Sequence, residues 1–158
     1  MRKRSKYRPK GVFINPVAYV VESMTPVAQH STFLTDLKIR NHMAMKNLTQ
    51  GQATRSDMDE LVVLGNVVEA LLRMGFGREY GGIVGEGIQS ILEVARRGVA
   101  NGGRFILNAK EMNALNDLME LHDAQMDVIT VRDLEQAMKL IDKEHRAGKM
   151  QRIVEKKA

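Results

Sequence analysis

The sequence predicts an all-α fold: a single five-helix bundle with a basic N-terminal arm and a basic C-terminal tail. Apolar residues recur at the three- and four-residue spacing of a helix over five segments between residues 31 and 147. Aromatic residues make up only 4% of the chain and methionine occurs 11 times, which favours a core of aliphatic side chains packed helix on helix. A chain of 158 residues is long enough for one domain with a buried core.

The net positive charge of the chain lies at its two ends. Residues 1–10 contain six Lys and Arg and no acid, and residues 146–158 contain five against one Glu. Residues 11–145 hold 13 Lys and Arg but 18 Asp and Glu, so the body is acidic although the whole chain carries a formal charge of +5. We therefore expect a basic, flexible arm at residues 1–10 and a basic tail at 148–158.

The segment at residues 11–29 connects the arm to the predicted bundle at 30–147. It carries Pro16 and Pro26 among β-branched and apolar residues, which predicts an extended strap laid on the body or a short helix after Pro16. Its apolar run also resembles the core of a signal peptide. Asn15 and Pro16 interrupt that run and no small-residue cleavage pattern follows, so we expect a mature N-terminus.

The first helix is predicted to begin near Ser31 or Thr32 and to end at about Leu48. Its inner face is formed by apolar residues at helical spacing: Leu34, Leu37, Ala44, Met45 and Leu48. Residues 50–53 then form a loop, which is short enough to place the next helix beside the first.

The second helix is predicted from Ser56 to Met74. Ser56-x-x-Asp59 resembles a capping box, with Asp in place of Glu, and marks the expected start. The apolar residues of this segment cover most of its circumference, which predicts that this helix is the buried centre of the domain. Gly75-Phe76-Gly77 stops the helix, because glycine readily takes the left-handed conformation after a helix end.

The third helix is predicted from about Glu79 to Arg97, and a turn follows at residues 98–103. Four glycines fall within its first half: Gly81, Gly82, Gly85 and Gly87. Each costs up to about 1 kcal/mol relative to alanine. Either the first turns are irregular, or another backbone packs closely against these glycines.

The fourth helix is predicted to begin after Asn108, which is the N-cap, with Glu111 in the capping-box position. Its inner face follows a helical spacing: Met112, Leu115, Met119, His122 and Met126. A break at Val128-Ile129 ends this helix.

The last helix is predicted to begin at Thr130, where Thr130-x-x-Asp133 again matches a capping box, and to end before Gly148. Its apolar stripe is regular: Val131, Leu134, Met138, Ile141 and His145. This stripe is either part of the core or the contact surface of a homodimer.

The composition excludes several classes of protein. The chain has no cysteine, which excludes disulfides, thiolate metal sites and a cysteine nucleophile and is typical of a reducing cytoplasm. No stretch approaches the ~20 apolar residues of a membrane-spanning helix, so we expect no membrane partner. The expected location is the cytoplasm.

Four histidines are the candidates for metal binding or acid–base chemistry: His30, His42, His122 and His145. Asp142 and His145 are spaced to share a helix face, but a metal site in a bundle needs partners on facing helices, and no second motif of this kind occurs. Ser90 lacks the G-x-S-x-G context of a nucleophile. We therefore expect no metal, no cofactor, no catalytic residue and no enzyme activity.

The basic arm is the best candidate for binding nucleic acid. Its candidate residues, with two from the tail, are Arg2, Lys3, Arg4, Lys6, Tyr7, Arg8, Lys10, Lys149 and Arg152. Such a cluster neutralises several phosphates, so binding would be non-specific and steeply dependent on salt, and Tyr7 would stack on an unpaired base. The alternative partner is an acidic protein surface, including the body of another copy of this chain.

The last two predicted helices, joined by a tight break at Val128-Ile129-Thr130, have the layout of a helix-turn-helix. A recognition helix there would present Arg132, Asp133, Gln136 and Lys139 to the major groove of DNA. Asp133 and Glu135 lie in its first turn, where they would repel phosphate. The pattern therefore favours a plain αα-hairpin.

The fourth predicted helix also carries a row of acids. These are Asp117, Glu120, Asp123 and Asp127. We interpret them as the solvated face of the helix. They are also a conceivable patch for binding another protein.

Five segments spanning nearly the whole chain resemble a family of small uncharacterised proteins from tailed phages and prophages of proteobacteria. The segments are MRKRSKYRPK (1–10), NPVAYV (15–20), DLKIRNH (36–42), MGFGREY (74–80) and LMELHDAQ (118–125). The resemblance implies a phage-derived accessory protein in the cytoplasm of a bacterial host, and it carries over no functional residue.

Together these observations predict a non-enzymatic, phage-derived or prophage-derived binding protein that engages nucleic acid through its basic arm. The alternative is a protein-interaction module, such as a phage-encoded inhibitor or modulator of a host or anti-phage defence complex. A component of the virion is a third possibility.

Overall fold

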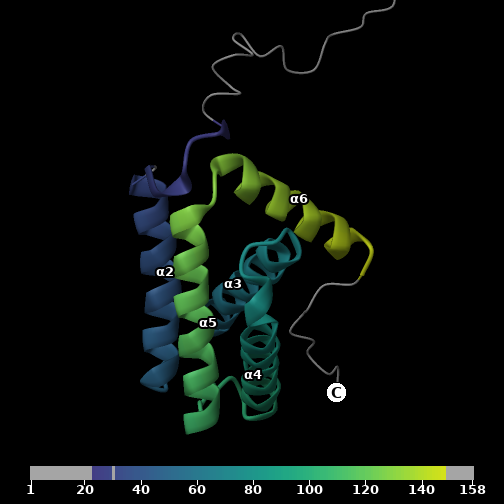
Figure 1. The fold of residues 1–158 in the computed structure, drawn as a ribbon. Helices are drawn as coiled ribbons and strands as arrows, with labels where there is room; N and C mark the ends of the chain where they lie inside the picture. The colour runs from purple at the N-terminus through teal and green to yellow at the C-terminus, as the bar shows by residue number, and fades with distance from the viewer. Residues whose placement is uncertain (1–22, 30, 149–158) are drawn as a thin grey trace, which may run out of the picture.

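The computed structural model describes residues 23–29 and 31–148 and confirms the all-α, five-helix bundle (Figure 1). The described residues form the α-helices α2 (Ser31–Thr49), α3 (Arg55–Arg73), α4 (Gly81–Ala100), α5 (Ala109–Val128) and α6 (Val131–Arg146). Two short 3-10 helices, η1 (Val27–Gln29) and η2 (Arg78–Tyr80), precede α2 and α4. The basic arm, the first part of the strap and the tail from residue 149 lie outside the described residues.

Helix α3 is the centre of the bundle, as its apolar circumference predicts. It contacts α2, α4, α5 and α6, whereas each of these helices has fewer neighbours. Its fully buried side chains include Met58, Leu61, Val68 and Leu71. Val63 is an apolar residue of this helix that is not buried, because half of its surface is exposed.

The start of α3 differs from the prediction. Thr54, not Ser56, is the N-cap: its Oγ1 accepts from the backbone N–H of Asp57, and the Asp57 carboxylate accepts from the backbone N–H of Thr54 at 2.8 Å. Both Thr54-x-x-Asp57 and Ser56-x-x-Asp59 match the capping box. Only Thr54 has the extended backbone that a cap requires, and Ser56 lies inside the first turn.

The capping boxes predicted for α5 and α6 are confirmed. The side chain of Asn108 accepts from the N–H of Glu111 at 2.9 Å, and Thr130 accepts from the N–H of Asp133 at 3.2 Å. In both cases the carboxylate accepts from the backbone N–H of the cap residue in return. Two donors at each helix start are thereby satisfied.

The glycines of α4 act in two different ways. The predicted first turn is irregular, because residues 78–80 form η2 and α4 begins only at Gly81. A Cβ at Gly85 would meet open space, but a Cβ at Gly87 would lie 2.9 Å from Leu118 of α5. The close neighbour of Gly87 is therefore a side chain and not a backbone.

The end of α4 also differs from the prediction, because the helix continues to Ala100 and does not stop at Arg97. Gly98 was expected in a turn, but it is a buried helical residue. A Cβ on Gly98 would overlap the ring of Phe105. The absent side chain lets the loop after α4 fold back onto the helix and seal the core with Phe105, which is buried.

Helix α6 packs on α3 and not along α5, so the interpretation of the last two helices as an αα-hairpin is wrong. Figure 1 shows α6 running across the top of the molecule, away from α5. Its apolar residues join a second buried cluster with Leu71 of α3 and Met126 of α5: Val131, Leu134, Ala137, Leu140 and Ile141. Met138 and His145, expected in the apolar stripe, are exposed.

The described end of the strap, residues 23–29, lies against the start of α6. The N–H of Val27 donates to the carbonyl of Ile129 at 3.0 Å, and the N–H of Val131 donates to the carbonyl of Thr25 at 2.9 Å. Val27 and Ile129 are both buried. No helix in the described part of the chain combines the length and the apolar character needed to cross a membrane.

Candidate nucleic-acid interface

One side of α6 carries a row of long polar side chains, which we call the cationic face. It consists of Arg132, Gln136, Lys139, Lys143 and Arg146, all exposed. These residues are four, three, four and three positions apart, so they lie along a single face of the helix. The opposite face packs on the core through residues such as Ala137, which is fully buried.

The acids of α6 are held away from this face, although the helix contains four acids and four Lys and Arg. The Asp133 carboxylate accepts from the backbone N–H and the hydroxyl of Thr130, both at 2.8 Å. The Glu144 carboxylate accepts from Arg73 of α3. Two of the four acids therefore point toward the helix start or the core side, which leaves the outward face predominantly cationic.

The other two acids flank the cationic face. Asp142 is exposed, and its Oδ2 lies 2.8 Å from Nη2 of Arg146, so it compensates part of that charge. Glu135 is half-buried. Besides Arg146, the cations of the face are Arg132, Lys139 and Lys143.

The two limits of the described chain lie at opposite ends of α6. Thr25 hydrogen-bonds to Val131 at the start of the helix, and Gly148 follows the helix end. The 16 residues of α6 span about 24 Å at 1.5 Å per residue. The described chain therefore stops near one end of the cationic face on the N-terminal side and near the other end on the C-terminal side.

The structure places the predicted nucleic-acid residues in two groups. The residues of the arm and tail lie outside the described part: Arg2, Lys3, Arg4, Lys6, Tyr7, Arg8, Lys10, Lys149 and Arg152. Arg132, Gln136 and Lys139, considered for a recognition helix, are exposed on one face. Asp133 is not on that face, because its carboxylate caps the helix.

Lys143 was missed by the sequence analysis, and Arg146 was counted only with the charge of the basic C-terminal end. The signal that identifies both was present, because they continue the four–three spacing that begins at Arg132. The charges of this segment sum to nearly zero, and this obscured the row. Summing the charges of each helix face separately reveals the row.

Two of the four acids in the row on α5 contact side chains of α2. The Asp123 carboxylate lies 3.0 Å from Nε2 of His42, and Asp127 lies 3.6 Å from Nζ of Lys38, both on α2. Asp117 and Glu120 are exposed. Two of the four acids expected to be a solvated face therefore connect α5 to α2.

The histidines occupy different environments in the described residues. His122 is buried, and its Nδ1 lies 3.7 Å from Asp123, too far for a hydrogen bond. Burial holds the pKa of His122 below its usual range, and the nearby Asp123 opposes this only in part. No group of three or more His, Cys, Asp or Glu in the described part is placed to hold a metal ion.

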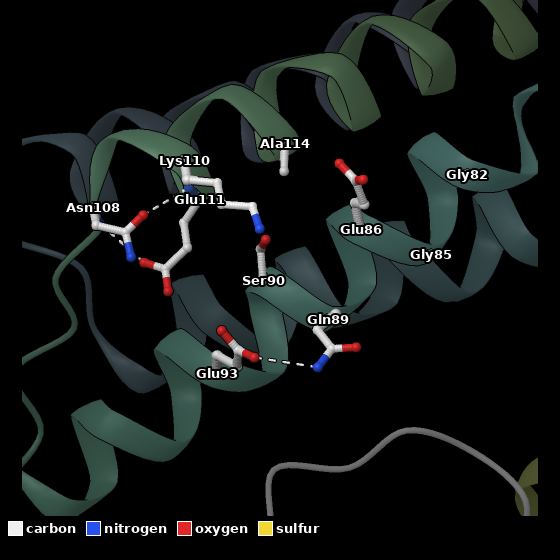
Figure 2. Close-up of a pocket in the computed structure, with 10 residues that line it drawn as sticks. All are labelled: Gly82, Gly85, Glu86, Gln89, Ser90, Glu93, Asn108, Lys110, Glu111 and Ala114. Carbon is white, nitrogen blue, oxygen red and sulfur yellow. Dashed lines mark hydrogen bonds between the residues drawn. The ribbon is translucent and has the colours of Figure 1, made fainter.

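A groove of about 490 Å³ lies between α4 and the first half of α5. Gly82 and Gly85 leave part of its α4 wall without side chains, and Figure 2 shows Glu86, Ser90 and Lys110 between the two helices. The described residues that line the groove include no histidine. Ser90 therefore has no imidazole base beside it there.

Other polar groups of this groove bind one another. Arg97 donates to both carboxylate oxygens of Glu111 at 2.6 Å, and this pairing holds the pKa of Glu111 below its usual range. The same guanidinium donates to the carbonyl of Ile106 at 3.0 Å. The Gln89 amide donates to Glu93 at 3.2 Å, as Figure 2 shows. The Arg97 contacts fasten the loop between α4 and α5.

Comparison with known protein families, with curated proteins and with solved structures found no match for this chain. The resemblance to phage proteins therefore stays a prediction. The features that bear on function are the geometry of α6 and the charge of the two ends.

Proposed function

We propose that this protein binds nucleic acid without catalysing a reaction, through the cationic face of α6 together with the basic arm and tail. The observation that carries the proposal is the arrangement of α6. The helix has equal numbers of acids and bases, but its described contacts turn Asp133 and Glu144 inward and leave Arg132, Lys139 and Lys143 outward. A track of positive charge, in a chain whose sequence is basic at both ends, suits a polyanion.

The electrostatics of the whole chain support the same proposal. The body is acidic, so a polyanion is repelled by most of the surface and is attracted at α6 and at the chain ends. Each phosphate neutralised by a cation releases counterions. This adds about 0.9 to the slope of log affinity against log salt for duplex DNA.

The test measures binding of the full-length protein to labelled duplex and single-stranded oligonucleotides by fluorescence anisotropy over a range of salt. We expect binding that falls steeply with salt. Lys139→Ala with Lys143→Ala should reduce the slope by about 1.8. Deletion of residues 1–10 should remove most of the affinity.

The matched control is Lys46→Ala with Arg104→Ala. Both residues are exposed, they lie on α2 and in the loop after α4, and their loss changes the net charge by the same amount. We expect this control to leave the salt slope nearly unchanged. An equal effect of the two double variants would mean that net charge alone, and not the cationic face, determines binding.

The competing proposal is a phage-encoded module that binds a host or defence protein. It is supported by the acids of α5, of which Asp117 and Glu120 are exposed. Absence of binding to any nucleic acid at low salt contradicts the nucleic-acid proposal. In that case, capture of a host protein that persists after nuclease treatment would support the competing one.

A further inference from the structure

We infer that the nucleic acid bound by the cationic face is double-stranded DNA, with α6 lying in the major groove and Gln136 contacting a base edge. This inference rests on the proposed function and names its substrate class. It depends on three observations: the position of α6, the chemistry of its outward side chains, and the placement of the aromatic residues.

The position of α6 allows it to enter a groove. It packs mainly on α3, and it forms the upper edge of the molecule in Figure 1. A helix with its side chains is about 10–12 Å wide, which matches a major groove about 12 Å wide. From Arg132 to Arg146 the cationic face extends about 21 Å along the helix axis.

The side chains on this face have the chemistry of direct readout. Arginine and lysine donate to the O6 and N7 of guanine, and glutamine pairs with the N6 and N7 of adenine. Gln136 is the one uncharged member of the face and lies between Arg132 and Lys139. Gln125, in contrast, is buried and donates to the carbonyls of Val68 and Phe76.

An uncharged amide adds nothing to the counterion release that drives phosphate binding. Gln136 therefore has a different role from its cationic neighbours, and that role is contact with a base. Recognition helices contact bases mainly through residues near their N-terminus. This assigns Arg132 and Gln136 to bases and leaves Lys139, Lys143 and Arg146 to the phosphates.

The placement of the aromatic residues disfavours a single strand as the ligand of this face. Proteins that bind single strands stack bases on aromatic side chains. The cationic face has none. Among the described side chains, the large aromatic with substantial exposure is Tyr80 of η2, which lies on a different element.

Duplex RNA is disfavoured for a different reason. The major groove of A-form RNA is deep and narrow, so side chains on a helix cannot reach its base edges. Double-stranded DNA is the remaining duplex whose major groove accepts α6.

The test uses the full-length protein and three labelled probes of one sequence: duplex DNA, single-stranded DNA and duplex RNA. We expect duplex DNA to bind at least about tenfold more tightly than the others at moderate salt, where non-specific contacts are screened. Methylation of guanine N7, an atom in the major groove, should block binding at specific positions.

The role of Gln136 is tested by selection from a pool of duplexes with a randomised centre. The unmodified protein should enrich sequences with adenine at one fixed position. Gln136→Ala should reduce that preference by about fivefold or more. Gln52→Ala is the matched control, because Gln52 is an exposed glutamine in the loop before α3.

The outcomes separate this inference from the proposed function. Failure to bind any probe at low salt overturns both. Binding that is equal for duplex and single strand, or that is insensitive to N7 methylation, overturns the inference and leaves the proposed function standing. Because Gln136 is exposed, its replacement should not unfold the protein, and circular dichroism verifies this.

Discussion

The guanidinium of Arg73, the last residue of α3, donates to the carboxylate of Glu144 in the last turn of α6. The same guanidinium donates to Glu69 one turn earlier in α3 at 3.1 Å. Arg73 therefore fastens the far end of α6 to the central helix. With the capping box at Thr130, this contact fixes the rotation of α6 and directs the cationic face outward.

Replacing Glu144 by alanine should loosen the end of α6. Because Arg73 is about half exposed, the ion pair contributes about 1 kcal/mol or less to the free energy of unfolding. We expect faster amide hydrogen exchange in the last turns of α6 and little change in α2. Glu69→Ala is the control, since it removes a partner of Arg73 within α3. Equal exchange in α6 of both variants would contradict the proposed fastening.

Replacing Thr54 by alanine should lower the free energy of unfolding by about 1 kcal/mol, because the N–H of Asp57 loses its acceptor. Ser56→Ala should change stability by less than about 0.5 kcal/mol, as expected for an exposed position without a special contact. Urea denaturation of both variants measures the difference. A larger loss for Ser56→Ala would place the helix start where the sequence pattern suggested.

Replacing Gly98 by alanine should destabilise the protein by about 1–3 kcal/mol, because the added methyl group overlaps the buried ring of Phe105. Gly85→Ala should instead stabilise it by about 0.5–1 kcal/mol, since its methyl group enters open space and alanine favours a helix. Thermal denaturation compares the two. Stabilisation by both substitutions would show that the loop holding Phe105 adapts freely.

Protonation of His122 should destabilise the folded state as the pH falls below about 6.5. Burial lowers the pKa of His122 in the folded protein, so the unfolded chain takes up a proton that the folded protein excludes. Stability is therefore full above about pH 6.5 and decreases toward the folded pKa. His122→Leu should flatten this dependence between about pH 7 and 5.5, measured by urea denaturation. An unchanged slope would contradict the assignment to His122.

Much of the secondary structure was predictable, because helix periodicity and capping depend on residues close in sequence. Asn108 and Thr130 have no competing capping-box motif beside them, and both were predicted correctly as N-caps. Thr54 and Ser56 lie within three residues of each other and each begins a capping-box motif. Ser56 was predicted to be the N-cap, and this prediction is wrong. Gly98 was assigned to a turn, since nothing local indicates that Phe105 occupies the space beside it.

The sequence by itself determined the five helices, the basic ends and the acidic body. The tertiary structure alone decided that α6 lies across α3, that Glu144 turns inward to Arg73, and that Asp123 and Asp127 contact α2. The physical reason is the range of the interactions. Backbone hydrogen bonds and caps join residues within one or two turns, whereas apolar packing and these ion pairs join helices that are distant in the chain.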